Sequence, residues 1–438
     1  MKTFRYLLVG LLSLVLSAFA PGCGGGDDEG GGGGGGGGGG SNVSGTVTLL
    51  ADWTGPEGES IQAVLDRFKE KNPNITVKYR PSTNLTQDLS TAVEGGKPPD
   101  LAAIPSPGIA KDYQARGAIK PIEFARSDVE ANFSQDWVDL GSIDGKLYGV
   151  FLKGANKSTV WYNKQAFEDA GIEPPETWDE LTKAAQTLKA SGVPAYSIDA
   201  GDGWPLTDLF ENLYVRVAGP DKYKQLADHE IPWTDASVKE ALSVMRELFR
   251  DGDNIVGGTS GALQTQLTNS ITAVFTNPPK GAMTFIGDFA PGVVLGQIET
   301  KPGTDFDFFD FPQIGDNEAI VGGGNLVVMF KDSPAAQALV KYLASPEAGE
   351  IWAKRGGFTS PNKNVSEDAY AEDTYRRAAS ELASAEKPVV FDMSDLAPGD
   401  FGSADEWTIF QGFFRNPTDV NGTAQKLEAA AAKAYKKG

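Results

Sequence analysis

The strongest fold signal in the sequence lies in residues 145–185, which read GKLYGVFLKGANKSTVWYNKQAFEDAGIEPPETWDELTKAA. Residues 146–150 and 157–162 are short extended runs that predict strands. Residues 164–170 and 178–191 place apolar side chains at helical spacing and predict helices. A chain that passes from strand to helix over so short a stretch is typical of an α/β protein.

The same alternation continues on both sides of this stretch. N-terminal to it, strands at 46–52, 75–79 and 101–104 alternate with helices at 58–71, 85–93 and 107–115. C-terminal to it, we predict strands at 195–199, 282–286, 306–311 and 325–330, and helices at 205–217, 237–250, 334–343, 348–355, 371–383 and 423–436. Such alternation predicts βαβ units and a parallel sheet with helices on both faces. Because ligands bind such sheets at the carboxyl ends of the strands, the residues that follow each strand are the candidate site residues.

The composition excludes several classes of protein. The 438 residues include 39 Lys and Arg but 59 Asp and Glu, which gives a formal net charge of −20. So acidic a chain is a poor candidate for binding nucleic acid. One cysteine and one histidine exclude an intramolecular disulfide framework, a thiolate metal cluster and a His-pair metal site. The length exceeds what one core usually supports, so we expect two lobes.

The N-terminus has the pattern of an export signal. Lys2 and Arg5 precede an apolar run at residues 7–19, which is long enough for a signal peptide but short for a bilayer span. Two cleavage sites are compatible with the sequence. Ala18-Phe19-Ala20 fits ordinary removal, whereas Ala20-Pro21-Gly22-Cys23 resembles a bacterial lipobox, with Ala20 and Pro21 departing from the usual residues.

The residues after Cys23 favour the lipobox. Glycines and three acidic residues fill this segment, and residues 30–40 are all glycine. Glycine loses too much backbone entropy to fold without buried surface, so the segment suits a tether. We therefore expect a signal peptide at 1–22 and a lipidated Cys23 with a Gly-rich tether at 23–45. The alternative is an unanchored secreted protein.

Several segments together resemble the extracellular solute-binding proteins of carbohydrate ABC transporters, the maltose-binding-like group. Residues 145–185 resemble that family's G-K-x-Y-G-(V/I)-P … W-Y-N-K-x-x-F-x-x-A-G … P-x-T-W-D-E-L pattern, with Phe151 where proline is usual. The resemblance covers about residues 46–435 and is nearest to the alpha-glucoside-binding branch. Further matching segments, in the family's order, are residues 49–79, 95–107, 281–290, 322–330 and 342–363.

The resemblance implies a fold and a function. The implied fold is α/β, a two-lobe periplasmic-binding-protein fold of type II with three interlobe crossings, near Phe151, Phe285 and Leu326. Lobe 1 would hold residues 46–152 and 286–325, and lobe 2 residues 153–285 and 326–438. The implied function is capture of a sugar or oligosaccharide, such as an alpha-glucoside, between the lobes and delivery to the permease of an ABC importer.

Further expectations concern cofactors, partners and location. We expect no cofactor, no metal, no nucleic acid and no catalysis. The expected partners are a small carbohydrate and the transporter's permease subunits, with membrane attachment through the lipid alone. We expect an exported monomer at the cell surface or in the periplasm.

Sugar binding requires particular side chains. A sugar offers an apolar face of C–H groups, which an aromatic ring can cover, and a rim of hydroxyls, which carboxylates and amides can bond. Residues of these types follow the predicted strands or lie beside the predicted crossings. The candidate ligand-binding residues are Trp53, Glu57, Ser106, Lys153, Asn156, Asp202, Trp204, Asp288, Phe289, Asn325 and Phe358.

Other interpretations of these residues stay open. Asp202 and Asp288 equally suit helix caps, and two carboxylates are also what a glycoside hydrolase needs. A polyamine- or peptide-binding protein of the same fold is a further alternative. Three more tryptophans match packing positions of the family pattern, namely Trp161, Trp178 and Trp352.

Overall fold

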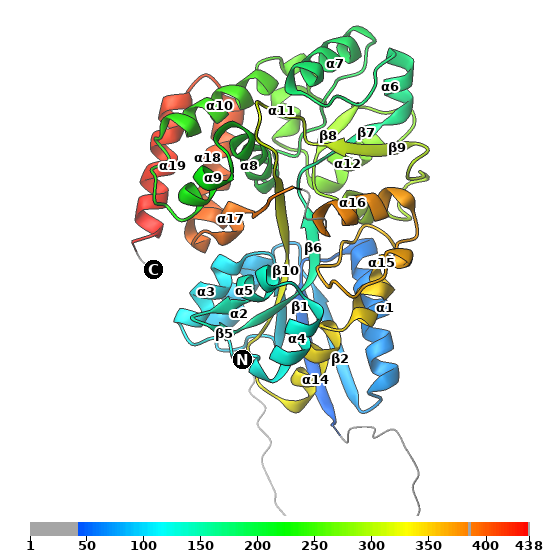
Figure 1. The fold of residues 1–438 in the computed structure, drawn as a ribbon, viewed down its shortest axis with the longest axis vertical. Coiled ribbons are helices and arrows are strands. Elements are labelled where there is room, and N and C mark those ends of the chain that lie inside the picture. Colours follow the sequence, from blue (N-terminus) through cyan, green and yellow to red (C-terminus); the bar gives the residue numbers. More distant parts are fainter. Residues whose placement is uncertain (1–42, 384–386, 437–438) are drawn as a thin grey trace, which may run out of the picture. The chain divides into compact units, whose positions relative to one another are not determined.

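Two neighbouring strands form the central connection of the fold. In this computed structural model, which describes residues 43–383 and 387–436, β6 (Gly149–Asn156) pairs antiparallel with β10 (Ile320–Met329). The two strands run through the middle of Figure 1, with helices above and below them. All eight residues of β6 are buried. Lobe 1 denotes the elements around the six-stranded sheet that contains these strands, and lobe 2 those around a separate three-stranded sheet.

Lobe 1 is built on a mixed sheet with the strand order β11-β10-β3-β1-β2, in which β6 also pairs with β10. β1 (Gly45–Ala51) runs parallel to β2 (Ile75–Pro81) and β3 (Leu101–Ile104). β10 is antiparallel to β3 and parallel to β11 (Val389–Phe391). The helices of lobe 1 are α1 (Gly55–Lys71), α2 (Leu85–Glu94), α3 (Pro107–Ala115), α4 (Arg126–Asn132), α5 (Gln135–Leu140), α14 (Pro334–Leu343) and α15 (Pro346–Ala353), with the short strands β4 (Ser142–Ile143) and β5 (Lys146–Leu147).

Alternation along β1 explains the layers of lobe 1. Side chains of a strand point to opposite faces in turn, so Leu49 packs in the cluster with α1 and α14, whereas Leu50 packs in the cluster with α2 and α3. α1 buries Ile61, Val64, Leu65 and Phe68, which is the spacing of one helix face. Helices therefore cover both faces of this sheet.

Lobe 2 is built on three antiparallel strands. β7 (Thr159–Asn163) lies between β8 (Met283–Phe285) and β9 (Phe306–Asp310). Its helices are α6 (Lys164–Ala170), α7 (Trp178–Ala190), α8 (Trp204–Ala218), α9 (Pro220–Ala227), α10 (Ala236–Phe249), α11 (Gly258–Ala262), α12 (Leu267–Phe275), α13 (Ala290–Val294), α17 (Met393–Leu396), α18 (Glu406–Arg415) and α19 (Val420–Ala434). α16 (Asp373–Ala383) packs against clusters of both lobes through Ala379 and Ala378.

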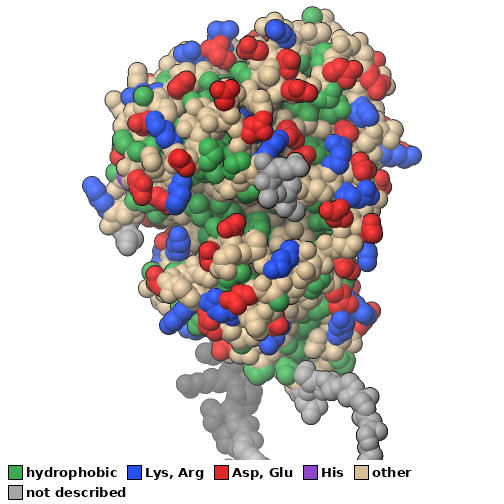
Figure 2. Space-filling view, viewed as in Figure 1, with side chains coloured by type: hydrophobic (Ala, Val, Ile, Leu, Met, Phe, Trp, Pro, Cys, Tyr) green, Lys and Arg blue, Asp and Glu red, His purple; other side chains and the backbone are tan. Residues whose placement is uncertain are grey.

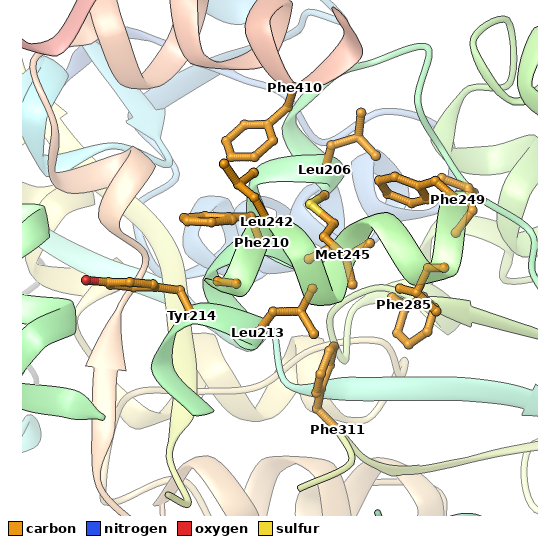
Figure 3. Close-up of a cluster of buried hydrophobic side chains, with 14 of the residues drawn as sticks. Leu206, Phe210, Leu213, Tyr214, Leu242, Met245, Phe249, Phe285, Phe311 and Phe410 are labelled. Atoms are coloured by element: carbon orange, nitrogen blue, oxygen red, sulfur yellow. The ribbon is translucent and has the colours of Figure 1, made fainter. Parts of the chain in front are cut away.

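The largest apolar cluster lies in lobe 2 around α8. Phe210 on α8 lies 5.0 Å, between ring centroids, from Phe410 on α18. Figure 3 shows these rings with Met245 of α10 and Phe311, which follows β9. Twelve of the fifteen residues of α8 are buried, so this helix lies at the centre of the lobe 2 core.

Two predictions of local structure are wrong. Residues 195–199 form no strand, although Tyr196 makes isolated bridges to Ile255 and Met283. The predicted parallel pairing holds only for β1, β2, β3 and the β10–β11 pair, because the other strand pairs of the described residues are antiparallel. Periodicity identifies a strand but not its direction in a sheet.

The predicted division into lobes differs from the structure after residue 285. Residues 286–325 were expected in lobe 1, but β9 pairs with β7 of lobe 2. Residues 326–438 were expected in lobe 2, but α14 and α15 pack against β1 and α1 of lobe 1. Phe285 itself stays in lobe 2, paired with Val160 of β7. The third passage between lobes therefore lies between α16 and α17, in addition to those at β6 and β10.

The lobes touch on two sides of the crossing strands, and glycines permit both contacts. A Cβ on Gly108 of α3 would lie 2.0 Å from the carbonyl oxygen of Ala397, just after α17. A Cβ on Gly357 would lie 2.1 Å from the Cα of Gly292 in α13. Real Cβ atoms do not approach backbone this closely, so side chains at these positions would hold the lobes apart.

Other expectations concern the N-terminus and the surface. The signal peptide, most of the tether and Cys23 lie outside the described residues. Within residues 43–383 and 387–436, no helix is long and apolar enough to cross a bilayer. Acidic and basic side chains are interspersed over the described part of the face in Figure 2.

Candidate functional site

A row of aromatic rings begins in lobe 1, next to the start of α1. The rings of Trp53 and Trp352 meet edge to face with centroids 4.9 Å apart. Phe358 stacks on the other side of Trp352 at 5.0 Å. Trp53 is 2% exposed and Phe358 also 2%, so both are packed into lobe 1. Trp352 is fully buried, as its predicted packing role requires, and its ring also faces the ammonium group of Lys153.

Lys153 connects the rings of the two lobes. Its Nζ lies 5.6 Å from the ring centroid of Trp352 and 5.3 Å from that of Phe289, at the start of α13 in lobe 2. Phe289 in turn lies 6.1 Å from Trp204, the first residue of α8. The rings thus form a continuous row from lobe 1 to lobe 2, with a cation between them, and such cation–π contacts strengthen when desolvated.

In the described part of the chain, Lys153 forms an ion pair with one carboxylate. Its Nζ forms an ion pair with Glu57 in the first turn of α1, and the two side chains are 5% and 14% exposed. Asp52 lies nearby and accepts a hydrogen bond of 3.3 Å from Nδ2 of Asn325 on β10. Solvent reaches Asp52, yet the surrounding protein atoms and Glu57 raise its pKa to about 6.

A second charged cluster lies under Trp204 in lobe 2. Lys157 follows β6, and its Nζ lies 5.8 Å from the ring centroid of Trp204. It contacts carboxylates of Asp208 on α8, Asp392 before α17 and Asp395 on α17. Burial alone would lower the pKa of Lys157, but the attraction of the three carboxylates outweighs it and raises the pKa. This cluster was not among the predicted site residues.

The three aspartates differ in protonation. Burial would raise the pKa of Asp392, but Lys157 and hydrogen bonds lower it to about 2. Burial raises the pKa of Asp208 to about 8, and burial with the neighbouring Asp392 raises that of Asp395 well above its usual range. Lys157 and Asp392 are therefore the ionised pair at neutral pH, and Asp208 and Asp395 favour their protonated forms.

Asp288 and Asn156 lie behind the row of rings. Oδ2 of Asp288 accepts a hydrogen bond of 2.5 Å from Thr359, and its backbone N–H donates to the carbonyl of Asn156. Burial raises the pKa of Asp288 to about 6, and within the described part of the chain its Oδ1 has no partner. Asn156 is fully buried, and its Nδ2 donates to Glu381 at 3.0 Å.

Two predicted residues stabilise local structure. Ser106 caps α3, accepting from the N–H of Ile109 at 3.0 Å, and its Oγ donates to the carbonyl of Asp395 at 2.6 Å. Asp202 accepts from the N–H of Leu267 at 3.0 Å, at the start of α12. Both side chains therefore bond backbone groups in this conformation, but Asp202 does not cap α8, the helix that follows it, since the N-cap of α8 is Gly203.

The predicted residues fall into three groups. Lys153, Glu57, Phe289 and Trp204 lie together along the row, and Asn325 reaches its edge through Asp52. A second group, buried behind the row, consists of Trp53, Phe358, Asn156 and Asp288. Ser106 and Asp202 form the third group, at the helix starts. Their roles in binding stay predictions.

Chemically, the arrangement offers aromatic faces with donors and acceptors at both ends. Such a set suits a ligand with both apolar and hydroxyl-rich surfaces. No group of three His, Cys, Asp or Glu in residues 43–383 and 387–436 has a geometry that could hold a metal ion.

Comparisons with known proteins identify the family. Residues 52–350 match the family described as "Bacterial extracellular solute-binding protein". The "Osmoprotective compounds-binding protein GgtB" of Synechocystis sp. is 33% identical over 370 residues, which cover 83% of this chain and 87% of that protein. The "Alpha-glucosides-binding periplasmic protein AglE" of Rhizobium meliloti is 32% identical over 404 residues, covering 87% and 86% respectively.

Solved structures show the same fold. The bacterial solute receptor AcbH, whose reported substrate preference is for β-D-galactopyranose, superposes with a TM-score of 0.78 at 21% identity, covering 90% of this chain and 100% of that one. Maltose-bound MalE3 of T. maritima superposes with a TM-score of 0.73 at 17% identity, covering 89% and 99%. These likenesses confirm the expected two-lobe α/β fold.

Proposed function

Because the chain belongs to the bacterial extracellular solute-binding proteins, we propose that it binds a carbohydrate, specifically an alpha-glucoside, and delivers it to the permease of an ABC importer. The observation that carries the proposal is the pair of partly exposed rings Phe289 and Trp204, with Lys153 and Lys157 beside them. Aromatic faces and charged hydrogen-bonding groups are the two features that pyranose recognition needs. The AglE relative supports the choice of alpha-glucosides.

Binding is coupled to movement of the lobes. A ligand shifts an open–closed equilibrium only by its differential affinity for the two states. The lobes are in contact at Gly108 and at Gly357, so this conformation is a closed one. A ligand that contacts rings of both lobes would favour this closed conformation. Micromolar affinity corresponds to about −8 kcal/mol, which stacking and charge-assisted hydrogen bonds can supply after ordering costs.

The proposal involves no catalytic step. The carboxylates considered for hydrolysis, Asp202 and Asp288, are held by the N–H of Leu267 and the hydroxyl of Thr359. The relatives in the comparison are solute-binding proteins. Purified protein should therefore release no reducing sugar from maltose, and detectable release would favour the hydrolase alternative.

Export and anchoring complete the proposal. The apolar N-terminal run and Cys23 suit a signal peptide followed by a lipid anchor, with residues 23–45 as a tether to the membrane. The protein would then act as a monomer at the cell surface or in the periplasm. Radiolabelled palmitate should enter the wild-type protein in a bacterial host, and Cys23→Ser should abolish the label.

A ligand screen with a matched pair of variants tests the binding site. We expect maltose or trehalose to raise the melting temperature, since a ligand that binds only the native state stabilises it. Trp204→Ala should weaken affinity by calorimetry at least tenfold. Trp178→Ala is the control, because Trp178 is also partly buried and also begins a lobe 2 helix, but stacks on Phe311.

The outcomes separate the alternatives. Equal loss of affinity in both variants would indicate general damage to lobe 2, and no loss in either would place the ligand elsewhere. Binding of spermidine without any sugar would favour the polyamine alternative.

A further inference from the structure

The cluster around Lys157 combines donors and acceptors at one spot. Nζ of Lys157 lies 3.2 Å from Oδ1 of Asp208 and 3.5 Å from Oδ2 of Asp395, and it also contacts Asp392. In the described residues, every ion pair of these three carboxylates is with Lys157. Buried acidic groups therefore outnumber their cation three to one.

The cluster is adjacent to a ring that solvent reaches. Trp204 and Asp208 are four residues apart on α8, which places them on one face of the helix. Trp204 is partly exposed, and Nζ of Lys157 lies 5.8 Å from its ring centroid. The Lys157 and Asp395 side chains keep 11% and 13% exposure, so the cluster is not completely buried.

A buried polar atom in this cluster lacks a partner. Asp208 is 4% exposed, and its Oδ2 makes no hydrogen bond within the described residues. An unsatisfied buried polar atom is destabilising. Both carboxyl oxygens of Asp392, by contrast, have partners, since they accept hydrogen bonds from Lys157, the hydroxyl of Ser394 and the N–H of Asp395. The carboxyl oxygen that can still form a hydrogen bond is therefore Oδ2 of Asp208, which lies on the same face of α8 as Trp204.

The backbone is shaped to hold Lys157 in place. A Cβ on Gly323 of β10 would lie 2.7 Å from Cε of Lys157, so the lysine stem lies directly over this glycine. The carbonyl of Lys157 accepts a hydrogen bond of 2.9 Å from Asn212, one turn beyond Asp208 on α8. Lys157 is thus fixed from β10 and from α8, as a preorganised binding group must be.

We propose that Lys157, Asp208 and Asp395 form a hydroxyl-binding subsite beside Trp204 that takes two adjacent hydroxyls of the pyranose ring lying on that indole. This inference rests on the proposed sugar-binding function and deepens it by assigning residues that select the hydroxyl pattern. A hydroxyl both donates and accepts, so it can bond an ammonium and a carboxyl at once. One such hydroxyl would give Oδ2 of Asp208 its missing partner.

The same geometry argues against a cationic ligand. The ammonium of Lys157 already occupies the centre of the carboxylates, so a ligand ammonium would approach a like charge within a few ångströms. A neutral polyol avoids this repulsion. A mixed donor–acceptor array next to an aromatic face therefore fits a sugar better than a polyamine.

Calorimetry on three variants of the full mature chain tests the subsite, with maltose, trehalose and spermidine as probes. Asp208→Asn and Asp395→Asn, on two different helices, should each weaken binding of whichever disaccharide the wild type binds by about 10-fold, which corresponds to the loss of one hydrogen bond of about 1.4 kcal/mol. Glu211→Gln is the matched control. Glu211 is buried on the same helix, but it bonds Tyr223 and the N–H groups of Met393 and Ser394.

The control should bind within about threefold of the wild type. Equal affinity of Asp208→Asn, Asp395→Asn and wild type would overturn the subsite while leaving sugar binding intact. Failure of the wild type to bind either disaccharide would instead count against the proposed function. Spermidine binding that Asp208→Asn abolishes would overturn the assignment of hydroxyls.

Protein folding is checked independently of ligand. The melting curve and far-ultraviolet circular dichroism of each variant are compared with the wild type before titration. If one aspartate variant is unfolded, the other variant still tests the subsite, because Asp208 and Asp395 lie on different helices. A loss of affinity in a folded Asp395→Asn variant supports the subsite on its own.

Discussion

Lys153 and Lys157 lie four residues apart at the same crossing, yet they differ in the ion pairs that they form. Among the described residues, Lys153 forms one ion pair, with Glu57, and has two flanking rings, while Asp52 and Asp288 lie close enough to feel its charge. Lys157 has three carboxylate partners and one ring. The first is an ion pair flanked by two rings, whereas the second has a carboxyl oxygen, Oδ2 of Asp208, without a partner in the described residues. Their lobes therefore contribute differently, lobe 1 mainly through packing and lobe 2 mainly through polar recognition.

Removal of each lysine is the strongest test of this difference. Lys157→Met should lower the free energy of unfolding at pH 8 by about 3–5 kcal/mol, because it leaves buried carboxylates without a cation. Lys153→Met should cost about 1–3 kcal/mol, because it strands one carboxylate that keeps some solvent contact. Urea titrations followed by tryptophan fluorescence measure both.

Repeating these titrations at pH 5 sharpens the comparison. At that pH the carboxyl groups left without Lys157 should be protonated. Part of the free energy of unfolding that Lys157→Met loses should then be restored. Lys189→Met serves as the control, since its pair with Asp251 is well exposed and should change stability by less than about 1 kcal/mol. Equal losses for Lys153→Met and Lys157→Met would contradict the difference between the clusters.

The adjacent glycines of β10 give the next largest expected effect. A Cβ on Gly324 would lie 2.4 Å from the backbone oxygen of Lys153, whereas a Cβ on Gly323 would meet the flexible end of Lys157. Gly324→Ala should therefore destabilise by about 2–3 kcal/mol and Gly323→Ala by about 1 kcal/mol. Urea unfolding at pH 7 measures both, and the reverse order would show that the lysine stem is held as rigidly as backbone.

The pH dependence of stability follows from the raised pKa of Asp208. Its folded pKa of about 8 exceeds the unfolded value, so between pH 4 and 8 the folded state binds more protons than the unfolded state. Stability should then fall as pH rises through this window. In Asp208→Asn, the decrease in the free energy of unfolding between pH 5 and 8 should be smaller by about 1 kcal/mol, as measured by urea unfolding. An unchanged slope would mean that Asp208 is ionised in the folded protein.

Much of the fold could be predicted from the sequence, because local signals define its elements. The predicted helices at 107–115, 164–170 and 334–343 match α3, α6 and α14 at both ends. A proline in the first turn marks the start of α3 and of α14, and Gly171 marks the end of α6. Sheet partners were not predictable in this way, since β9 joins β7 through contacts of Phe306 and Phe308 with Trp161 that no local pattern contains.

The site was predictable only in part, for the same reason. Lys153, Trp204 and Phe289 follow from strand ends and crossings and lie together in the row. The Lys157 cluster joins Asp208 to Asp392, 184 positions apart in the sequence, and only the tertiary fold brings them to one lysine. A lysine next to a predicted crossing was the one sequence signal for this cluster.

The smallest effect is expected for Asp52, an aspartate near Lys153 that solvent reaches, unlike the buried aspartates near Lys157. Surrounding protein and Glu57 raise the pKa of Asp52 to about 6, so its ionised form is slightly disfavoured in the folded state above that pH. Asp52→Asn should therefore raise stability at pH 8 by no more than a few tenths of a kcal/mol, because solvent screens this site, and should have no effect at pH 4. The amide oxygen can still accept the hydrogen bond from Asn325. Differential scanning fluorimetry at the two pH values measures the change, and a gain as large as that of Asp208→Asn would mean that Asp52 is as strongly desolvated as the lobe 2 cluster.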